Sequence, residues 1–200
     1  MSGKIALTYD DGPDPTWTPR LLASLTEADA RATFFVIAPR ALANPELIGA
    51  MHADGHEVAF HCHRHVSHVE LSEDELAVDL AVGLRQLRSV GSFPRAWRAP
   101  WGRETAATRR LAGRHGLRLW GWNLDSHDWR GDSAGEMHAA LLAQGGLRDG
   151  DVVLMHDGLG PGARRRDCEQ TLALTRLLLA EAEREGLDPA PVSECEGVLA

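Results

Sequence analysis

Short apolar stretches alternate with helix-like segments along the chain. Helix-start signals lie between the stretches: a proline directly follows Thr18 and Asn44, and Ser72 to Glu75 has the pattern of a capping box. Such alternation predicts right-handed strand–helix–strand units and a parallel α/β sheet, either a barrel or a doubly wound sheet. The predicted strands are Ile5–Asp10, Ala32–Ile37, Glu57–His61, Ala96–Pro100, Arg118–Asp125 and Asp151–Asp157, with a weakly marked seventh at Pro191–Glu194.

Two long helices are marked most clearly. Behind Ser72, leucines recur at helical spacing and predict a buried stripe, and the last helix should open at Asp167 and end at Gly186. The 200 residues, of which 44% are hydrophobic, contain no repeat and no linker, so we expect one domain over residues 1–200. The leucines of the stripe are Leu76, Leu80, Leu84 and Leu87.

Composition argues against several classes of partner. The formal charge of −8 disfavours binding to nucleic acids, and the run Arg164 to Arg166 is interpreted as a solvated loop. No apolar run approaches the roughly 18 residues of a membrane span. The start of the chain lacks the pattern of a signal peptide, and three scattered cysteines fit a reducing compartment, so a cytoplasmic location is expected. The oligomeric state is left open.

Ionisable and aromatic residues gather where the predicted strands end. In both parallel architectures the carboxyl ends of the strands form the face on which sites are built. A lone Asp-Asp-Gly-Pro would more often be a simple turn, but chance placement rarely brings such groups from five segments to one face. The residues concerned are Asp10, Asp11, His61, Arg98, Trp101, Asp125 to Trp129, His156 and Asp157.

The histidine-rich stretch after the third strand suggests a metal site. His61, His63, His65 and His68 lie within eight positions. Two imidazoles and one carboxylate suit Zn²⁺ and leave a coordination position open for water, as in hydrolytic sites. One of the adjacent aspartates after the first strand could bind the metal while its neighbour serves as a base. The spacing alone does not show which of the two aspartates is the ligand and which is the base.

Five ordered motifs carry a family resemblance. They are LTYDDGPDP, GHEVAFHCHRHVSHVELS, RAPWG, WNLDSHDW and VVLMHDG, and they extend from about Ala6 to Gly158. This set resembles the polysaccharide deacetylase family, also called the NodB-homology domain or carbohydrate esterase family 4. The resemblance implies a distorted (β/α) barrel of about seven parallel strands. It also implies metal-dependent hydrolysis of an N-acetyl group on a sugar.

The resemblance assigns roles by motif position. Asp11, His61 and His65 are implied as metal ligands, and His63 and His68 as nearby pocket or supporting groups. Asp10 is the implied general base with Arg98 as its partner, and His156 the implied general acid with Asp128 as its partner. The backbone N–H of Trp101 is implied in stabilising the developing oxyanion. The implied substrate contacts are Trp101, Trp129, Leu154 and Pro100.

Departures from the family pattern bear on the substrate. Phe60 and Cys62 flank the first histidine ligand, and Trp101 stands where tyrosine is more frequent. Bulky Phe60 and Trp101 are expected near the pocket, where they could select a smaller or differently shaped amide than a glycan chain. Cys62 is expected to pack as a small apolar group. A soluble chito-oligosaccharide or small N-acetylated metabolite is favoured over peptidoglycan. Zn²⁺ is the first choice of metal, with Co²⁺, Ni²⁺ or Mn²⁺ also able to serve.

Three alternatives remain at this point. One is a related C–N hydrolase acting on a cyclic imide, ureide or formamide. A second is a catalytically silent sugar-binding barrel, which the intact set of acid, base and ligand residues disfavours. A third is metal sequestration by the histidine-rich loop, which predicts metal binding without turnover.

Overall fold

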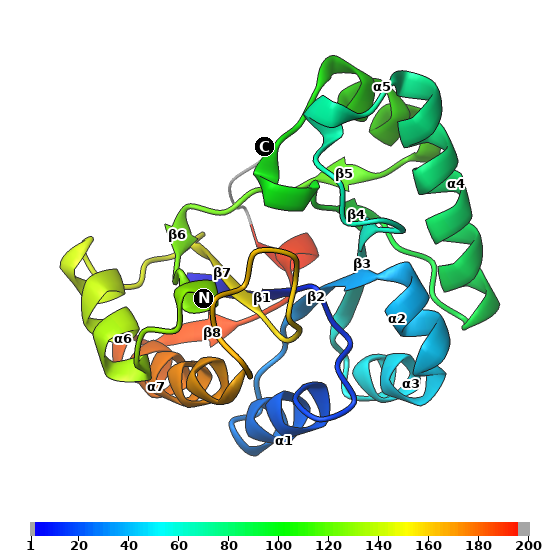
Figure 1. Cartoon of the computed structure of the whole chain (residues 1–200). Coiled ribbons are helices and arrows are strands. Elements are labelled where there is room, and N and C mark those ends of the chain that lie inside the picture. The colour runs from blue at the N-terminus through cyan, green and yellow to red at the C-terminus, as the bar shows by residue number, and fades with distance from the viewer. Residues whose placement is uncertain (1–2, 196–200) are drawn as a thin grey trace.

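The computed structural model describes residues 3–195, whose strands all belong to one parallel sheet. Seven strands follow the order β5-β4-β3-β2-β1-β7-β6, and β8 pairs with the first residues of β1. The sheet curves and helices surround it (Figure 1). The strands are β1 (Gly3–Asp10), β2 (Thr33–Ile37), β3 (Glu57–Cys62), β4 (Ala96–Trp97), β5 (Arg118–Leu119), β6 (Leu124–Asp125), β7 (Val152–His156) and β8 (Leu187–Pro189).

This arrangement confirms the predicted distorted barrel of parallel strands. Among the described residues β5 and β6 form the two ends of the hydrogen-bonded path, so the barrel is open between them. The α-helices are α1 (Thr18–Glu27), α2 (Ala38–Ala43), α3 (Pro45–Ala53), α4 (Glu73–Ser89), α5 (Ala106–His115), α6 (Ala134–Ala143) and α7 (Glu169–Glu185). Within residues 3–195 no helix is long and apolar enough to cross a membrane.

The predicted strand Arg118–Asp125 was wrong as a single element. Its first part, β5, pairs with β4, and its last part, β6, pairs with β7 on the other side of the opening. The residues between them carry the chain across that opening. Two carbonyl groups of this crossing accept hydrogen bonds from the guanidinium of Arg98. Its Nε donates to the Trp120 oxygen at 3.3 Å, and its Nη2 donates to the Gly121 oxygen at 2.8 Å. This one apolar run therefore forms two short strands and the segment that connects them across the opening.

The weak strand predicted at Pro191–Glu194 was also misplaced. The eighth strand, β8, lies just before it, and Val192–Glu194 forms a single 3₁₀ turn. The N–H of Val192 donates to Thr33 Oγ1 at 2.9 Å and not to β1, so the pairing with β1 ends before this residue. The predicted strand Ala96–Pro100 is likewise shorter than expected, because a second 3₁₀ turn begins at Pro100.

Side chains on the two faces of the sheet differ in size. The inner face carries small residues such as Ala6, Ala59 and Ala96, with Phe35 and Trp120 filling the centre. The outer face carries larger groups that pack against the helices, including Phe60. The predicted leucine stripe of α4 is buried there, as expected. Successive strand residues point to opposite faces, so the position of Phe60 follows from that of its neighbour His61 on the inner face.

Helix ends follow the sequence signals in part. Ser72 caps α4 in a complete capping box, and Gly186 ends α7 with a φ of 67°. Thr18 is the first residue of α1 and not its cap, because its hydroxyl donates instead to Asp157 Oδ2 at 2.6 Å. Asn44 precedes α3 without a capping side-chain bond. The last helix begins at Glu169, whose N–H donates to Asp167 Oδ1 at 3.0 Å.

Candidate active site

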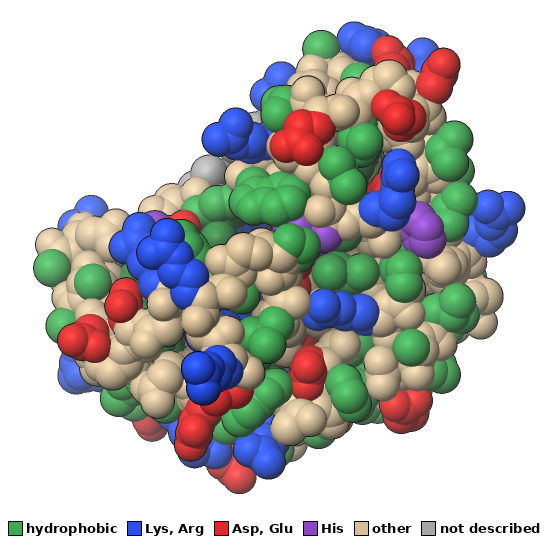
Figure 2. Space-filling view, in the orientation of Figure 1, with side chains coloured by type: hydrophobic (Ala, Val, Ile, Leu, Met, Phe, Trp, Pro, Cys, Tyr) green, Lys and Arg blue, Asp and Glu red, His purple; other side chains and the backbone are tan. Residues whose placement is uncertain are grey.

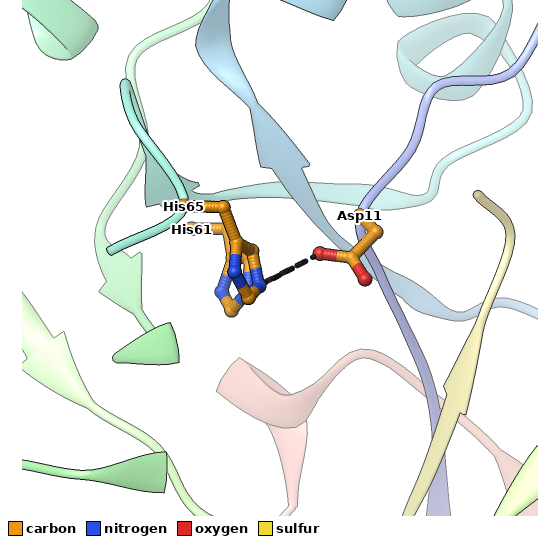
Figure 3. Close-up of side chains that lie close together, drawn as sticks. All are labelled: Asp11, His61 and His65. Atoms are coloured by element: carbon orange, nitrogen blue, oxygen red, sulfur yellow. Dashed lines mark ion pairs between the residues drawn. The ribbon is translucent and has the colours of Figure 1, made fainter. Parts of the chain in front are cut away.

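Three predicted ligands meet beyond the carboxyl ends of β1 and β3. Asp11 leaves β1 with a φ of 73°, His61 lies near the end of β3, and His65 lies in the turn that follows. Asp11 Oδ1 is 3.5 Å from His61 Nε2 and 3.2 Å from His65 Nε2. The centres of the two imidazole rings lie 5.1 Å apart, and both rings face the carboxylate (Figure 3).

The chemistry of this cluster fits a divalent cation. One oxygen and two nitrogens lie within 4.8 Å of one another, and Asp11 Oδ1 is buried with no hydrogen-bond partner among the described residues. Burial lowers the pKa of His61, which favours the neutral imidazole that metals bind. Its Nδ1 lies 2.8 Å from the Arg98 carbonyl oxygen. Donation there leaves the Nε2 lone pair directed at the cluster.

The carboxylate of the cluster is ionised. Burial alone would raise the pKa of Asp11, but His65 and His61 outweigh this effect and hold that pKa at about 2. An ionised carboxylate and neutral imidazoles are the ligand forms that a cation requires. Residues Asp11, His61 and His65 would therefore hold the metal.

The other histidines of the stretch point elsewhere. His63 Nδ1 lies 2.9 Å from Gln86 Oε1, and His68 Nδ1 lies 3.0 Å from Thr108 Oγ1. Neither belongs to the cluster. Cys62 is buried, and burial raises its thiol pKa well above the usual value, so it packs as a neutral group.

A carboxylate that the sequence analysis did not single out holds the turn between the two histidine ligands. Asp79, buried on α4, accepts from the backbone N–H of His63 at 3.0 Å and of Arg64 at 2.8 Å. These two bonds fix the chain midway between His61 and His65. Several other acidic residues precede Asp79 on the same helix, so nothing in the sequence marked this one as buried.

We expect Asp79→Ala to weaken metal binding about tenfold, because groups that support ligands typically contribute at least that much to metal affinity. Competition with a chromophoric chelator would measure the change. Asp74→Ala, at an exposed position on the same helix, serves as the control and should bind metal like the wild type. Equal affinities for the two variants would contradict the supporting role of Asp79.

A buried ion pair lies on one side of the ligand cluster. Arg98 Nη1 donates to Asp10 Oδ1 at 2.8 Å and to the Thr8 hydroxyl at 2.8 Å. The guanidinium is fully buried, with its central carbon 4.0 Å from the centre of the Phe35 ring. The bonds to the Trp120 and Gly121 carbonyl oxygens complete its partners, so its orientation is fixed and it fixes Asp10 in turn.

An imidazole–carboxylate pair comes from β7 and the turn after β6. His156 lies opposite Asp10 in the β1–β7 register, and its Nδ1 is 2.7 Å from Asp128 Oδ1. Burial alone would lower the pKa of His156, but the Asp128 carboxylate outweighs this effect and raises it to about 9. The same contact, together with Arg165, holds the pKa of Asp128 well below its usual range despite burial. His156 is therefore protonated at neutral pH.

Arg165 was misjudged from the sequence. Its side chain is only 5% exposed, whereas the Arg164 to Arg166 run was expected to be solvated. Its Nη1 donates to Asp128 Oδ2 at 2.7 Å, and Thr171 Oγ1 donates to the same oxygen at 2.7 Å. A charge run does not reveal which of its members turns inward.

One cavity of about 270 Å³ is bordered by the three ligand residues, by Asp10 and by His156. Of the predicted substrate contacts, Trp101, Trp129 and Leu154 line it, together with Trp122, which the sequence analysis did not select. Pro100 is buried and begins the turn that carries Trp101, but it is not among the lining residues. In Figure 2 histidine surface is visible near the middle of the corresponding face, beside hydrophobic surface.

The expected position of Phe60 near the pocket was wrong. This side chain is fully buried on the outer face of the sheet, where its ring centre lies 5.9 Å from that of Trp97. It packs so closely on α4 that a Cβ at Gly83 would overlap it. Trp101, by contrast, is 48% exposed, and its ring centre is 4.3 Å from that of His65.

Comparison with known proteins identifies the family of this chain. The family model described as polysaccharide deacetylase matches residues 2–120. A chitooligosaccharide deacetylase of a Bradyrhizobium species is 34% identical, over 95% of this chain and 89% of the relative. This chain belongs to the polysaccharide deacetylase family. A peptidoglycan-N-acetylglucosamine deacetylase of Bacillus cereus is 33% identical over 95% of this chain and 86% of the relative.

A solved member of the polysaccharide deacetylase family has the same architecture. The family 4 carbohydrate esterase from Streptomyces lividans, determined in complex with acetate, superposes with a TM-score of 0.82 at 28% identity. The superposition covers 93% of this chain and 91% of that structure. The family resemblance drawn from the five motifs is thus confirmed.

Proposed function

We propose that this protein is a metal-dependent deacetylase that hydrolyses the N-acetyl group of an amino sugar or of a short chito-oligosaccharide. The observation that carries the proposal is the placement of three functional groups around one cavity. The Asp11, His61 and His65 cluster lies there with the Asp10 and His156 side chains. Family membership and the activities of the named relatives support the same reaction.

The metal would supply Lewis acidity: it would polarise the acetyl carbonyl and make water a better nucleophile at neutral pH. Asp10 accepts the proton of the attacking water, and Arg98 holds its carboxylate in one orientation. His156 then donates a proton to the leaving amine nitrogen. Asp128 binds Nδ1 of that imidazole, so the opposite nitrogen, Nε2, is the one left to deliver the proton.

The walls of the cavity fit an N-acetylated sugar. Trp101, Trp122 and Trp129 offer flat apolar faces, and Leu154 offers an aliphatic contact suited to the acetyl methyl. The relatives are named for chitooligosaccharide and for peptidoglycan N-acetylglucosamine. Both substrates present the same N-acetyl group, and we place this chain with the shorter one because its negative charge disfavours acidic wall polymers.

Zn²⁺ is the proposed native metal, because two imidazoles and a carboxylate form a common catalytic zinc set. Co²⁺, Ni²⁺ and Mn²⁺ could occupy the same donors. A cytoplasmic location stays a prediction; the three cysteines, all buried and without a disulfide, support a reducing compartment.

Acetate release from N-acetylchito-oligosaccharides of graded length tests the proposed substrate. The Zn²⁺-loaded protein should release acetate from short oligomers faster than from long ones. No acetate from any length, in protein that carries one metal per chain, would reject these glycans. Turnover of a cyclic imide or formamide in the same protein would then support the related C–N hydrolase, and metal binding without any turnover would support sequestration.

The pH dependence should report the His156–Asp128 pair. A general acid must be protonated to act, so kcat is expected to fall as the pH rises through the pKa of His156. Because Asp128 raises that pKa, Asp128→Asn should move the alkaline fall of kcat to lower pH, besides lowering the maximum. Profiles of kcat against pH, taken at equal metal loading, would show this. An alkaline limb at the same pH in both proteins would argue against His156 as the acid.

A further inference from the structure

Arg165 contacts both members of the imidazole–carboxylate pair and the residues next to them. Besides Asp128, its guanidinium contacts the Thr171 hydroxyl, and its Nη2 donates to the carbonyl oxygens of His156 at 2.9 Å and Gly158 at 3.2 Å. The bonds therefore tie the connection between β7 and α7 to both members of the imidazole–carboxylate pair. This connection crosses in front of the sheet in Figure 1.

The two oxygens of Asp128 have separate partners. Oδ2 accepts from Arg165 Nη1, from Thr171 Oγ1 and from the His156 backbone N–H, the last at 2.9 Å. Oδ1 accepts from His156 Nδ1. The three hydrogen bonds to Oδ2 fix the plane of the Asp128 carboxylate. Oδ1 is therefore held in line with Nδ1 of the His156 imidazole.

The same loop is held close to the metal ligands. Gly160 packs against the Asp11 carboxylate so closely that a Cβ would overlap Oδ2, and Arg40 donates to the carbonyl oxygens of Asp11 at 2.6 Å and Leu159 at 2.9 Å. The N–H of Arg164 donates to the Trp129 carbonyl oxygen at 2.8 Å. The loop is thus anchored at Leu159, Gly160 and Arg164, all before Arg165, and these contacts hold the segment that carries the guanidinium.

We propose that Arg165 is a positioning residue that holds the Asp128 carboxylate, and through it the His156 imidazole, in the orientation needed to protonate the leaving amine. This inference rests on the proposed function. The guanidinium acts through Asp128 and does not itself transfer a proton. A planar group with several donors suits the task, because a lysine in its place could reach only part of the same acceptors at once.

Arg165→Ala and Arg165→Lys test the proposal, with Arg166→Ala as the control because Arg166 is exposed. Arg165→Ala is expected to lower kcat about 10- to 100-fold, since small displacements of a catalytic group have effects of this size. KM and the metal content should stay close to wild type. Arg165→Lys should give an intermediate kcat, and Arg166→Ala a wild-type one.

A second readout does not depend on turnover. The low-field proton resonance of His156 Nδ1–H, assigned by its loss in His156→Gln, reports the bond to Asp128 in each protein. It should broaden or shift in Arg165→Ala and persist in Arg166→Ala. If Arg165→Ala does not fold, as judged by thermal unfolding, the same comparison in Arg165→Lys decides.

An unchanged resonance with unchanged kcat in the Arg165 variants would overturn the positioning role. A raised KM with wild-type kcat would overturn it as well, because that result identifies Arg165 as a substrate contact. If the wild type released no acetate from any glycan, the proposed function would fail while the resonance comparison still tested Arg165. The two failures are therefore distinguishable.

Discussion

Replacement of His61 by alanine is expected to remove stoichiometric metal binding and to lower acetate release by about a thousandfold or more. His61 provides one of three converging donor atoms, and its ring is fixed by the Arg98 carbonyl oxygen. Loss of Lewis acidity removes several kcal/mol of transition-state stabilisation, and each 1.4 kcal/mol corresponds to about tenfold in rate. Metal content by elemental analysis and acetate release on the same sample would show both effects.

His63→Ala is the matched control for this experiment. His63 lies two positions away and contacts Gln86, not the cluster. It should retain one metal per chain and most of the activity. Loss of metal in both variants to the same degree would show that the whole histidine-rich stretch binds metal, as in the sequestration hypothesis.

Asp10→Asn is expected to lower kcat by about a hundredfold to ten-thousandfold while leaving the metal in place, because an amide cannot accept the proton of the attacking water. Asparagine keeps the size of the side chain and an oxygen for Arg98 Nη1. The measurement is steady-state kinetics at saturating metal, with the metal content determined in parallel. The expected signature is one metal per chain with little turnover.

Asp54→Asn is a suitable control for that change, because Asp54 is exposed at the end of α3 and should tolerate the substitution. Activity of Asp10→Asn close to that of the control would show that another group serves as the base. The neighbouring Asp11 is the first residue to examine in that case, since the two aspartates leave the same strand in different directions.

Much of the site could be predicted because the carboxyl ends of parallel strands share one face. Asp10, His61 and His156 each lie at or next to the end of a predicted strand, and the structure brings all three to one cavity. This inference needs only the approximate ends of the strands. An error of a few residues, such as the three at the end of β4, does not move a side chain away from that face.

Pairing partners were harder to predict. An apolar run such as Arg118–Asp125 has the composition of one strand, and only the opening of the barrel decides that its two ends join different edges of the sheet. This pairing arises from contacts distant in sequence. The outward position of Phe60, by contrast, follows from the alternation of side chains along β3, because its neighbour His61 faces the site.

Two of the supporting residues were not predicted. Asp79 and Arg165 carry no local motif, and each lies among residues of like charge that are solvated. Both side chains are buried beside a group that needs a hydrogen-bond partner. For Asp79 this group is the backbone of the turn between the histidine ligands, and for Arg165 it is the Asp128 carboxylate. Such roles become visible only when the tertiary contacts are known.

Metal-dependent deacetylation is tested most directly by measuring acetate release from one short N-acetylchito-oligosaccharide before chelation, after removal of the metal, and after addition of Zn²⁺. We expect release to stop when the metal is removed and to return as the metal content approaches one per chain. Release that continues at the same rate in fully metal-free protein would contradict the central role of the Asp11, His61 and His65 cluster.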